Sequence, residues 1–255
     1  MNKIRLLILA FSICLLAACA PSAQAIQAAI AQTQAAWTPT PTSTLTSTPT
    51  QTSTPIPTLT PKPTPVPVVL YSDDFSNNQS GWMQTNDAGA KFQYSGGQYV
   101  ISRPKGILES WAYANQNFSD AVLTVDALLV SGDSSQTGPV VFWRYVDKNN
   151  FYSLQLTGDG QLMIAKEYKG EWQKLFAWAP SYAIHKGQQI NKITIAFGGG
   201  TSTIYINNRY VASIQDSSLT TGDIGLGAFS GETSAVEVSF DNLVIYSFDS
   251  WTPPE

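Results

Sequence analysis

Three residues at alternating positions, Glu109, Trp111 and Tyr113, have side chains of the types that bind sugars. In a β-strand, side chains two residues apart point to the same face, so these three are expected on one face, with Ser110 and Ala112 on the other. An aromatic ring covers the apolar face of a pyranose, and polar side chains beside it bind the hydroxyl groups. The alternation therefore predicts a strand that contacts carbohydrate.

Two polar residues from later strands complete the predicted ligand-binding set. Arg144 is expected to share a strand face with Phe142, and Gln155 is expected to share one with Ser153. The predicted set is Glu109, Trp111, Tyr113, Arg144 and Gln155. The alternative interpretation is structural, because large aromatic side chains usually lie in a core. That core would hold Trp82, Trp143, Trp172 and Trp178, with Trp111 as a further member.

The residue pattern favours binding without catalysis. Glu237 and Asp241 are four positions apart in an expected strand, which separates them by about 13 Å of backbone. Retaining glycosidases need carboxyl groups about 5–5.5 Å apart. Glu167 and Glu171 flank an expected turn, and His185, the one histidine of the chain, falls in an expected loop. Neither a zinc cluster nor a Ser/His/Asp site is predicted, and carboxylates paired from distant strands stay open as an alternative.

Acidic residues at the two ends of the domain predict a structural calcium site. Asp73 and Asp74 begin the first expected strand region, and Asp241 with Asn242 lies in the last. First and last strands are often neighbours in sandwiches, so hard oxygen ligands of the kind that calcium prefers would converge there. The alternative is that these residues simply occupy turns and strand ends. No other cofactor is predicted.

The N-terminus has the pattern of a bacterial export signal. Lys3 and Arg5 precede an eleven-residue apolar run over 6–16, which is too short to span a membrane. The run ends in Leu16-Ala-Ala-Cys19, which resembles the lipobox, whose cysteine carries the lipid and becomes the mature N-terminus.

The lipobox predicts where the protein is held. We expect a signal peptide over 1–18, a lipidated Cys19, and anchoring to the extracytoplasmic face of the cell membrane. The alternative is an ordinary secretory signal cleaved near Ala18 or Ala20. In that case Cys19 would be an unmodified thiol.

A linker rich in threonine and proline follows, with 12 Thr and 9 Pro among the 30 residues of 38–67. Such a composition cannot bury a core, so the linker is expected to be disordered and extended. At about 3.1 Å per residue, its greatest reach is on the order of 90 Å. The lipidated N-terminus and linker together span 19–67 and would hold the domain away from the membrane.

Composition excludes several classes of protein. The formal net charge is −4 and there is no basic cluster, so nucleic acid is not an expected partner. Both cysteines, Cys14 and Cys19, precede the domain, which therefore has neither a disulfide nor thiol chemistry.

The remainder of the chain reads as short strands separated by turn signals. Ser95-Gly96-Gly97 and Asn207-Asn208 are hairpin signals. Alternation over 121–130 predicts one inward face made by Leu123, Val125, Ala127 and Leu129. About a dozen such strands predict an all-β, two-sheet sandwich over 68–248, followed by a C-terminal tail over 249–255.

Motifs along the domain are similar to those of a known superfamily. They are Asp73-Asp74-Phe75, Gly81-Trp82, Phe142-Trp-Arg-Tyr145, Asn149-Asn-Phe-Tyr-Ser-Leu-Gln-Leu156, Tyr205-Ile-Asn207, Gly222-Asp-Ile-Gly-Leu-Gly227 and Phe240-Asp-Asn-Leu-Val-Ile245. Together they resemble the concanavalin A-like lectin/glucanase superfamily, in its laminin-G-like and 3-keto-disaccharide-hydrolase-like branches. The resemblance implies a jelly-roll sandwich and places the Arg144-type position on its concave sheet.

The combined expectation is a membrane-anchored lipoprotein whose sandwich binds a polysaccharide or other glycan without catalysis. A glycoside hydrolase-like enzyme is one alternative, which rests on the superfamily alone. A protein-interaction module of the cell envelope is the other.

Overall fold

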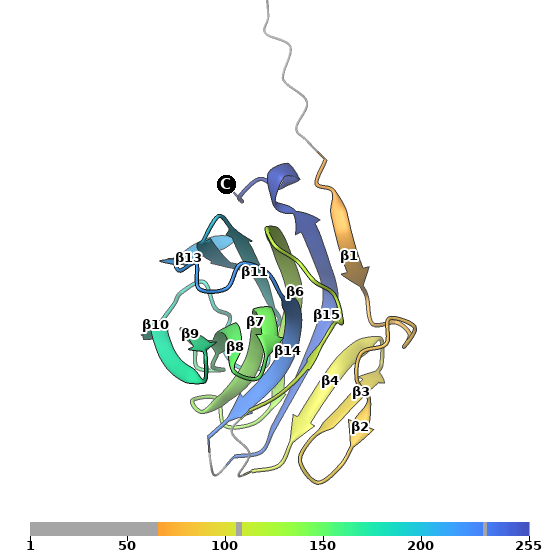
Figure 1. Cartoon of the computed structure of the whole chain (residues 1–255). Coiled ribbons are helices and arrows are strands. Elements are labelled where there is room, and N and C mark those ends of the chain that lie inside the picture. Colours follow the sequence, from red (N-terminus) through yellow and green to blue (C-terminus); the bar gives the residue numbers. More distant parts are fainter. Residues whose placement is uncertain (1–65, 106–108, 232–233, 255) are drawn as a thin grey trace, which may run out of the picture. The chain divides into compact units, whose positions relative to one another are not determined.

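The computed structural model describes residues 66–105, 109–231 and 234–254, which form an almost entirely β domain. Two antiparallel sheets pack against each other (Figure 1). Within these ranges no helix is long and apolar enough to cross a membrane. The all-β, two-sheet class predicted from the sequence is confirmed. The predicted signal peptide, Cys19 and the linker up to residue 65 lie outside the described residues.

The first sheet has nine strands among the described residues, in the order β13-β12-β11-β6-β15-β4-β3-β2, and β1 also pairs with β15. Strands β1 and β4 pair with different halves of β15, on the side opposite β6. The strands are β1 Val69–Asp73, β2 Thr85–Asn86, β3 Lys91–Ser95, β4 Gln98–Arg103, β6 Ala121–Ser131, β11 Asn191–Gly198, β12 Thr201–Ile206, β13 Arg209–Gln215 and β15 Val236–Ser247.

The second sheet has six strands in the described ranges, in the order β10-β9-β8-β7-β14-β5. Most neighbours are consecutive in sequence, whereas β14 inserts between β7 and β5. The strands are β5 Glu109–Tyr113, β7 Thr137–Asp147, β8 Asn150–Leu156, β9 Gln161–Tyr168, β10 Glu171–Pro180 and β14 Asp223–Ser230. A 3₁₀ turn, η1 Phe248–Ser250, follows β15.

The main core lies between the sheets and is built by strand alternation. On β6 the four residues predicted to face inward, Leu123, Val125, Ala127 and Leu129, are all buried in it. Trp143 of β7 and Trp82 also belong to this core, as the structural interpretation predicted for them. Because the domain contains no cysteine, this apolar burial is the main source of its stability.

The hairpin signals in the sequence correspond to tight turns. Ser95 pairs with Gln98 across Gly96-Gly97, whose φ angles are 63° and 76°. Asn207 and Asn208 join β12 to β13 with φ angles of 52° and 64°. Glycine and asparagine tolerate this left-handed backbone better than most residues, so the local sequence favours both turns.

Candidate functional site

The second sheet carries a cluster of aromatic side chains on the face turned away from the first sheet, which we call the outer face. Val140, Phe142, Phe151 and Phe229 form a buried cluster separate from the main core. Trp111 and Tyr145 are partly buried and pack against it. Ordinary outward strand positions are polar, so an aromatic outer face needs a functional or packing explanation.

The outer face is strongly curled. Gln155 Nε2 of β8 donates a hydrogen bond of 3.0 Å to Glu109 Oε1 of β5, although two strands lie between them. The ring centroids of Trp178 on β10 and Phe229 on β14 are 5.8 Å apart, with three strands between. In a flat sheet these strand pairs would be about 14 and 19 Å apart. The second sheet therefore curves around its outer face, and we call the concave side the trough. Figure 1 shows the curvature of β7 to β10.

Two glycines make room for the aromatic rings on the floor of this trough. A Cβ added at Gly227 of β14 would lie 2.9 Å from the Phe142 ring and 3.1 Å from Trp111 Cβ. A Cβ at Gly225 would lie 3.3 Å from Phe142 Cβ. Because β14 carries no side chains at these outward positions, the side chains of Phe142 and Trp111 on the neighbouring strands pack close to its backbone.

Glu109 is the titratable group most affected by this surface. Burial raises its pKa to about 7, although the hydrogen bond from Gln155 and the positive charge of Arg103 act in the opposite direction. Glu167 adds a smaller electrostatic contribution that raises the pKa further. Glu109 therefore exchanges its proton near neutral pH and can either donate or accept a hydrogen bond there.

Four of the five residues in the predicted ligand-binding set gather on the outer face. Glu109, Trp111 and Tyr113 alternate outward along β5, as the sequence pattern predicts. Gln155 joins them through its hydrogen bond to Glu109. Their binding of a ligand stays a prediction, but their common location is a finding.

Arg144 does not join them, and the prediction that it shares a face with Phe142 is wrong. Phe142 pairs with Gly225 and Tyr145 pairs with Asp223, so β7 has one residue more than β14 between these pairs. This β-bulge, with Arg144 at a φ of 49°, breaks the alternation. Arg144 turns inward and is only 2% exposed.

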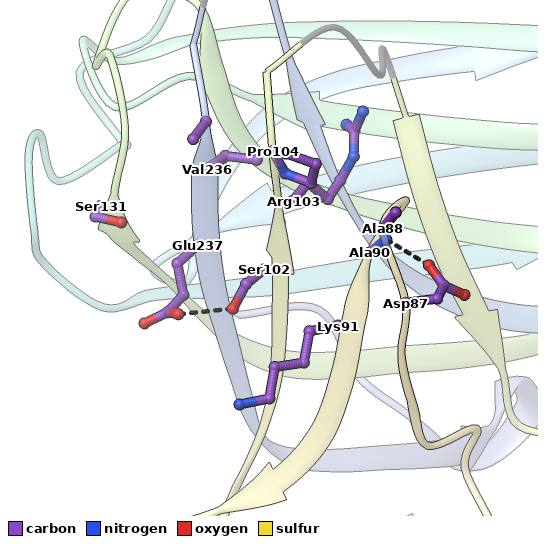
Figure 2. A pocket seen from close by; sticks show the side chains of 11 residues that line it. Asp87, Ala88, Ala90, Lys91, Ser102, Arg103, Pro104, Ser131, Val236 and Glu237 are labelled. Carbon is purple, nitrogen blue, oxygen red and sulfur yellow. Dashed lines mark hydrogen bonds between the residues drawn. The ribbon is translucent and has the colours of Figure 1, made fainter.

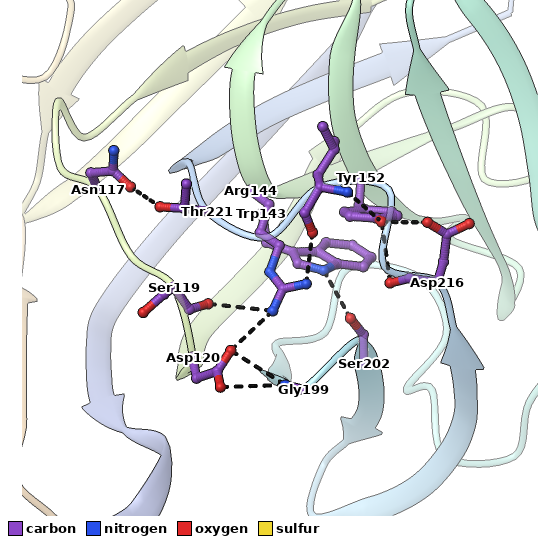
Figure 3. A network of polar contacts seen from close by, with 11 residues as sticks. Asn117, Ser119, Asp120, Trp143, Arg144, Tyr152, Gly199, Ser202, Asp216 and Thr221 are labelled. Carbon is purple, nitrogen blue, oxygen red and sulfur yellow. Dashed lines mark hydrogen bonds and ion pairs between the residues drawn. The ribbon is translucent and has the colours of Figure 1, made fainter.

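Inside the domain, Arg144 belongs to a polar network that ties loops to strands (Figure 3). Its Nη1 donates to the Leu219 carbonyl at 2.8 Å, and its Nη2 pairs with Asp120 Oδ1 at 3.2 Å. The guanidinium also lies 5.6 Å from the centre of the Phe197 ring. These contacts make Arg144 a structural residue and not a direct ligand contact.

A second part of this network contains a buried ion pair. Lys166 Nζ lies 2.5 Å from Asp216 Oδ2, and Tyr152 donates a hydrogen bond of 2.6 Å to Asp216 Oδ1. Burial opposes ionisation of Asp216, but hydrogen bonds from Lys166, Tyr152 and Ser218 together hold its pKa well below the ordinary value. The pair fixes the 216–222 loop against β8 and β9.

Two tryptophans assigned to the core by the structural interpretation lie at the surface. Trp172 is 49% exposed and Trp178 is 38% exposed. The pairing of β10 with β9 shifts register between Lys174 and Phe176 and again between Phe176 and Ala179. Trp172 precedes both shifts and pairs with Glu167, which lies beside Phe151 on the outer face. Trp178 reaches across the trough to Phe229, so both tryptophans belong to the outer face.

Tyr145 and Phe151 also lie on the outer face, although neither belongs to the predicted ligand-binding set. Tyr145 was hidden by the bulge, which no local sequence signal marks. Phe151 follows the same alternation as Ser153 and Gln155 on β8, so the existing pattern would have identified it.

Another hollow among the described residues has a partly polar lining. A cavity of about 430 Å³ is lined in part by Lys91, Ser102, Arg103 and Glu237 (Figure 2). Ser102 donates to Glu237 Oε2 at 2.6 Å. The Arg103 side chain points away from these two side chains, and its Nη1 donates to the Ala228 carbonyl at 2.9 Å.

The predicted calcium ligands come together only in part. Strands β1 and β15 are neighbours, as expected, with Asp73 opposite Leu243. Asp73 and Asp74 line one hollow, and Asp73 Oδ2 is a buried oxygen without a hydrogen-bond partner, which a cation would satisfy. Asp241 lines a different, smaller hollow. Among the described residues, no group of three or more His, Cys, Asp or Glu side chains is arranged to hold a metal ion.

Comparison with known proteins places the fold. Neither a family model nor a curated protein matches the chain. The carbohydrate-binding module CBM66 from Bacillus subtilis aligns with a TM-score of 0.54 at 18% identity, covering 66% of this chain and 96% of that one. A Bacillus licheniformis β-glucanase aligns with a TM-score of 0.54 at 10% identity, covering 69% of this chain and 97% of that one.

A third structure is LamA from Z. galactanivorans in complex with laminaritriose and laminaritetraose. Its TM-score is 0.53 at 12% identity, covering 71% of this chain and 99% of that one. Likeness at this level of identity concerns the fold alone. The domain has the concanavalin A-like jelly-roll fold, as the resemblance found in the sequence implied.

Proposed function

We propose that the domain binds carbohydrate on the outer face of its second sheet. The observation that carries this proposal is the combination of aromatic rings with the Glu109–Gln155 pair in one curled trough. Trp111, Tyr113 and Trp178 offer ring surface, while the carboxyl and amide groups supply hydrogen bonds of the kind that sugar hydroxyls need.

The compared structures support this proposal at the level of fold. One is named a carbohydrate-binding module, another a β-glucanase, and a third contains bound laminari-oligosaccharides. A polysaccharide or other glycan is accordingly the ligand class that we propose for this chain. We propose further that binding occurs without catalysis.

One observation favours hydrolysis as a second candidate function. Glu109 has a pKa near 7, as a general acid requires, and Glu167 lies on the same face and influences it electrostatically. Such an enzyme would release reducing sugar from a glycan, and Glu109→Gln would abolish that release. Binding without any release would leave the non-catalytic module as the function.

We also propose that the protein is an exported lipoprotein attached to the membrane through Cys19. The proposal rests on the Leu16-Ala-Ala-Cys19 sequence and the Thr/Pro-rich linker that follows. Labelling of cells with radioactive palmitate tests it. The wild-type protein should incorporate label and Cys19→Ser should not; equal labelling would contradict the proposal.

A glycan array probed with residues 66–255 tests the binding function. The array should be run with calcium and with a chelator, since Asp73 and Asp74 remain a candidate calcium site. Retention of a defined glycan group supports the proposal, and its loss in chelator adds the calcium. No retention under either condition would contradict glycan binding and favour a protein-interaction module.

A further inference from the structure

Three aromatic rings on the outer face form a continuous stack. Tyr113 and Tyr145 have ring centroids 5.4 Å apart with planes 17° from parallel. Tyr145 and Phe151 are 6.0 Å apart at 22°. Phe151 is 6% exposed, Tyr145 is partly buried, and Tyr113 is 43% exposed. The stack therefore runs from a buried base to an exposed end.

Tyr113 is the open end of this stack. Its one ring contact among the described residues is with Tyr145. Phe151, in contrast, also packs against Phe142 and Trp111. The far side of the Tyr113 ring is thus available for another flat group, and its orientation is fixed from below.

The β-bulge at Arg144 creates this stack. Regular alternation after Phe142 and Trp143 would put Tyr145 on the inner face. Because Arg144 turns inward instead, Tyr145 emerges on the outer face opposite Asp223. The inward position of Arg144 is held by the Leu219 carbonyl and Asp120 (Figure 3).

We propose that Tyr113 forms a sugar subsite at the end of the ring stack, and that Arg144 is the positioning residue that builds it through Tyr145. This inference rests on the proposed carbohydrate binding and adds a specific contact to it. A sugar ring with an apolar face would extend the stack as its fourth member. Because packing already orders the stacked rings, binding of a sugar costs little further side-chain entropy.

Charge around the stack selects the class of sugar. Asp223 pairs across the strands with Tyr145, and Glu167 pairs with Phe151. Both neighbours are acidic, so a uronic acid or a sulfated sugar would be disfavoured at this position. The subsite therefore takes an uncharged pyranose.

Affinity electrophoresis of residues 66–255 tests the subsite, with laminarin and barley β-glucan as neutral probes and alginate as an anionic one. Tyr113→Ala should weaken retention by a neutral probe about tenfold, whereas Tyr113→Phe should stay within about threefold. Tyr182→Ala is the matched control, because Tyr182 is a fully exposed tyrosine in the turn after β10. Alginate should be retained least.

A double-mutant cycle separates positioning from general stability. Tyr145→Ala and Arg144→Met should each weaken retention about as much as Tyr113→Ala does. The variant that combines Arg144→Met with Tyr145→Ala should be retained as well as either of these two single variants. Loss of stability alone would not move the affinity of the folded fraction. If Arg144→Met fails to fold, Tyr145→Ala tests the stack by itself, since the buried contacts of Arg144 remain.

The outcomes distinguish this inference from the proposed function. Retention that falls in Trp111→Ala but is unchanged in Tyr113→Ala and Tyr145→Ala would overturn the subsite and leave glycan binding intact. If no probe retarded the wild type, both the subsite and the proposed glycan binding would be contradicted for these polysaccharides. A crystal structure of Arg144→Met with Tyr145 still stacked on Tyr113 would overturn the positioning role without reference to any ligand.

Discussion

Glu109 shows how a surface changes the chemistry of one residue. Burial in the trough raises its pKa to about 7, so the folded state holds this proton more tightly than the unfolded chain does. The neutral form therefore favours folding, and the stability contribution is present below the ordinary carboxyl pKa. It is lost as pH rises through about 7.

Replacement of this carboxyl should remove the pH dependence. We expect Glu109→Gln to be more stable than the wild type at pH 8 by on the order of 1 kcal/mol, with little difference at pH 4. Urea unfolding at several pH values measures this, with Glu171→Gln at the exposed β9–β10 turn as control. Equal pH profiles for wild type and Glu109→Gln would contradict the account.

Asp216 should behave in the opposite way. Its hydrogen bonds from Lys166, Tyr152 and Ser218 hold its pKa low, so its contribution to stability is present above the ordinary aspartate pKa and is lost in acid. Asp216→Asn leaves Lys166 buried without its partner and should cost roughly 3 kcal/mol at pH 7. Chemical denaturation measures this cost.

The cost of Asp216→Asn should shrink at pH 3, and Asp249→Asn at an exposed position should have little effect at either pH. If Asp216→Asn were as stable as the wild type at pH 7, the Lys166–Asp216 ion pair would not stabilise the fold.

Residue types and their spacing predicted much of the candidate site. They did not predict how deeply these side chains are buried or which of them form hydrogen bonds with one another. Alternation placed Glu109, Trp111, Tyr113 and Gln155 correctly because period two is a local property of strands. The pairing of Glu109 with Gln155 depends on the curl of the whole sheet. No local pattern encodes that curl.

Among the strands, the bulge in β7 is the feature that the local sequence does not predict. A bulge is defined by the partner strand, because two residues on one strand face one on the other. Arg144 and Tyr145 therefore exchanged the faces expected for them. A hairpin without such an irregularity, the one turning at Gly96-Gly97, was predicted correctly.

Gly222 maintains the bulge from the neighbouring loop. A Cβ at this position would lie 2.4 Å from the Arg144 carbonyl carbon, and its φ of 157° is a conformation that other residues rarely adopt. Gly222→Ala should therefore lower stability by about 2 kcal/mol more than a glycine replacement in open space. It should also disturb the Tyr113–Tyr145 stack.

Gly187→Ala is the matched control, since Gly187 also has a positive φ but no atom near its Cβ position. Urea unfolding of both variants isolates the steric effect from the backbone effect. Comparable losses in the two variants would show that the loop does not hold the bulge.

At the scale of the whole molecule, the fold was predictable because its determinants are repeated along the chain. Many short alternating runs and hairpin turns point to two sheets, and the motifs identify the jelly roll. The direction of curl, and with it the trough, comes from long-range packing between strands such as β10 and β14. Those contacts have no counterpart in any single segment.

The domain should fold without covalent help. Both cysteines precede residue 66, and a continuous core joins the two sheets. Residues 66–255 should unfold in one cooperative transition whose midpoint is unchanged by reductant. Calorimetry with and without dithiothreitol checks this, and two separate transitions would contradict a single cooperative domain.

Glycan binding by the outer face of the second sheet is the proposal on which the Tyr113 subsite depends. The most direct test measures the affinity of one retained glycan for wild type, Trp111→Ala and Tyr210→Ala by isothermal titration calorimetry. Tyr210 is an aromatic residue of the first sheet with 62% exposure, which makes it a matched surface control. We predict at least a tenfold loss for Trp111→Ala and no change for Tyr210→Ala. Unchanged affinity in Trp111→Ala, or a loss confined to Tyr210→Ala, would contradict the account.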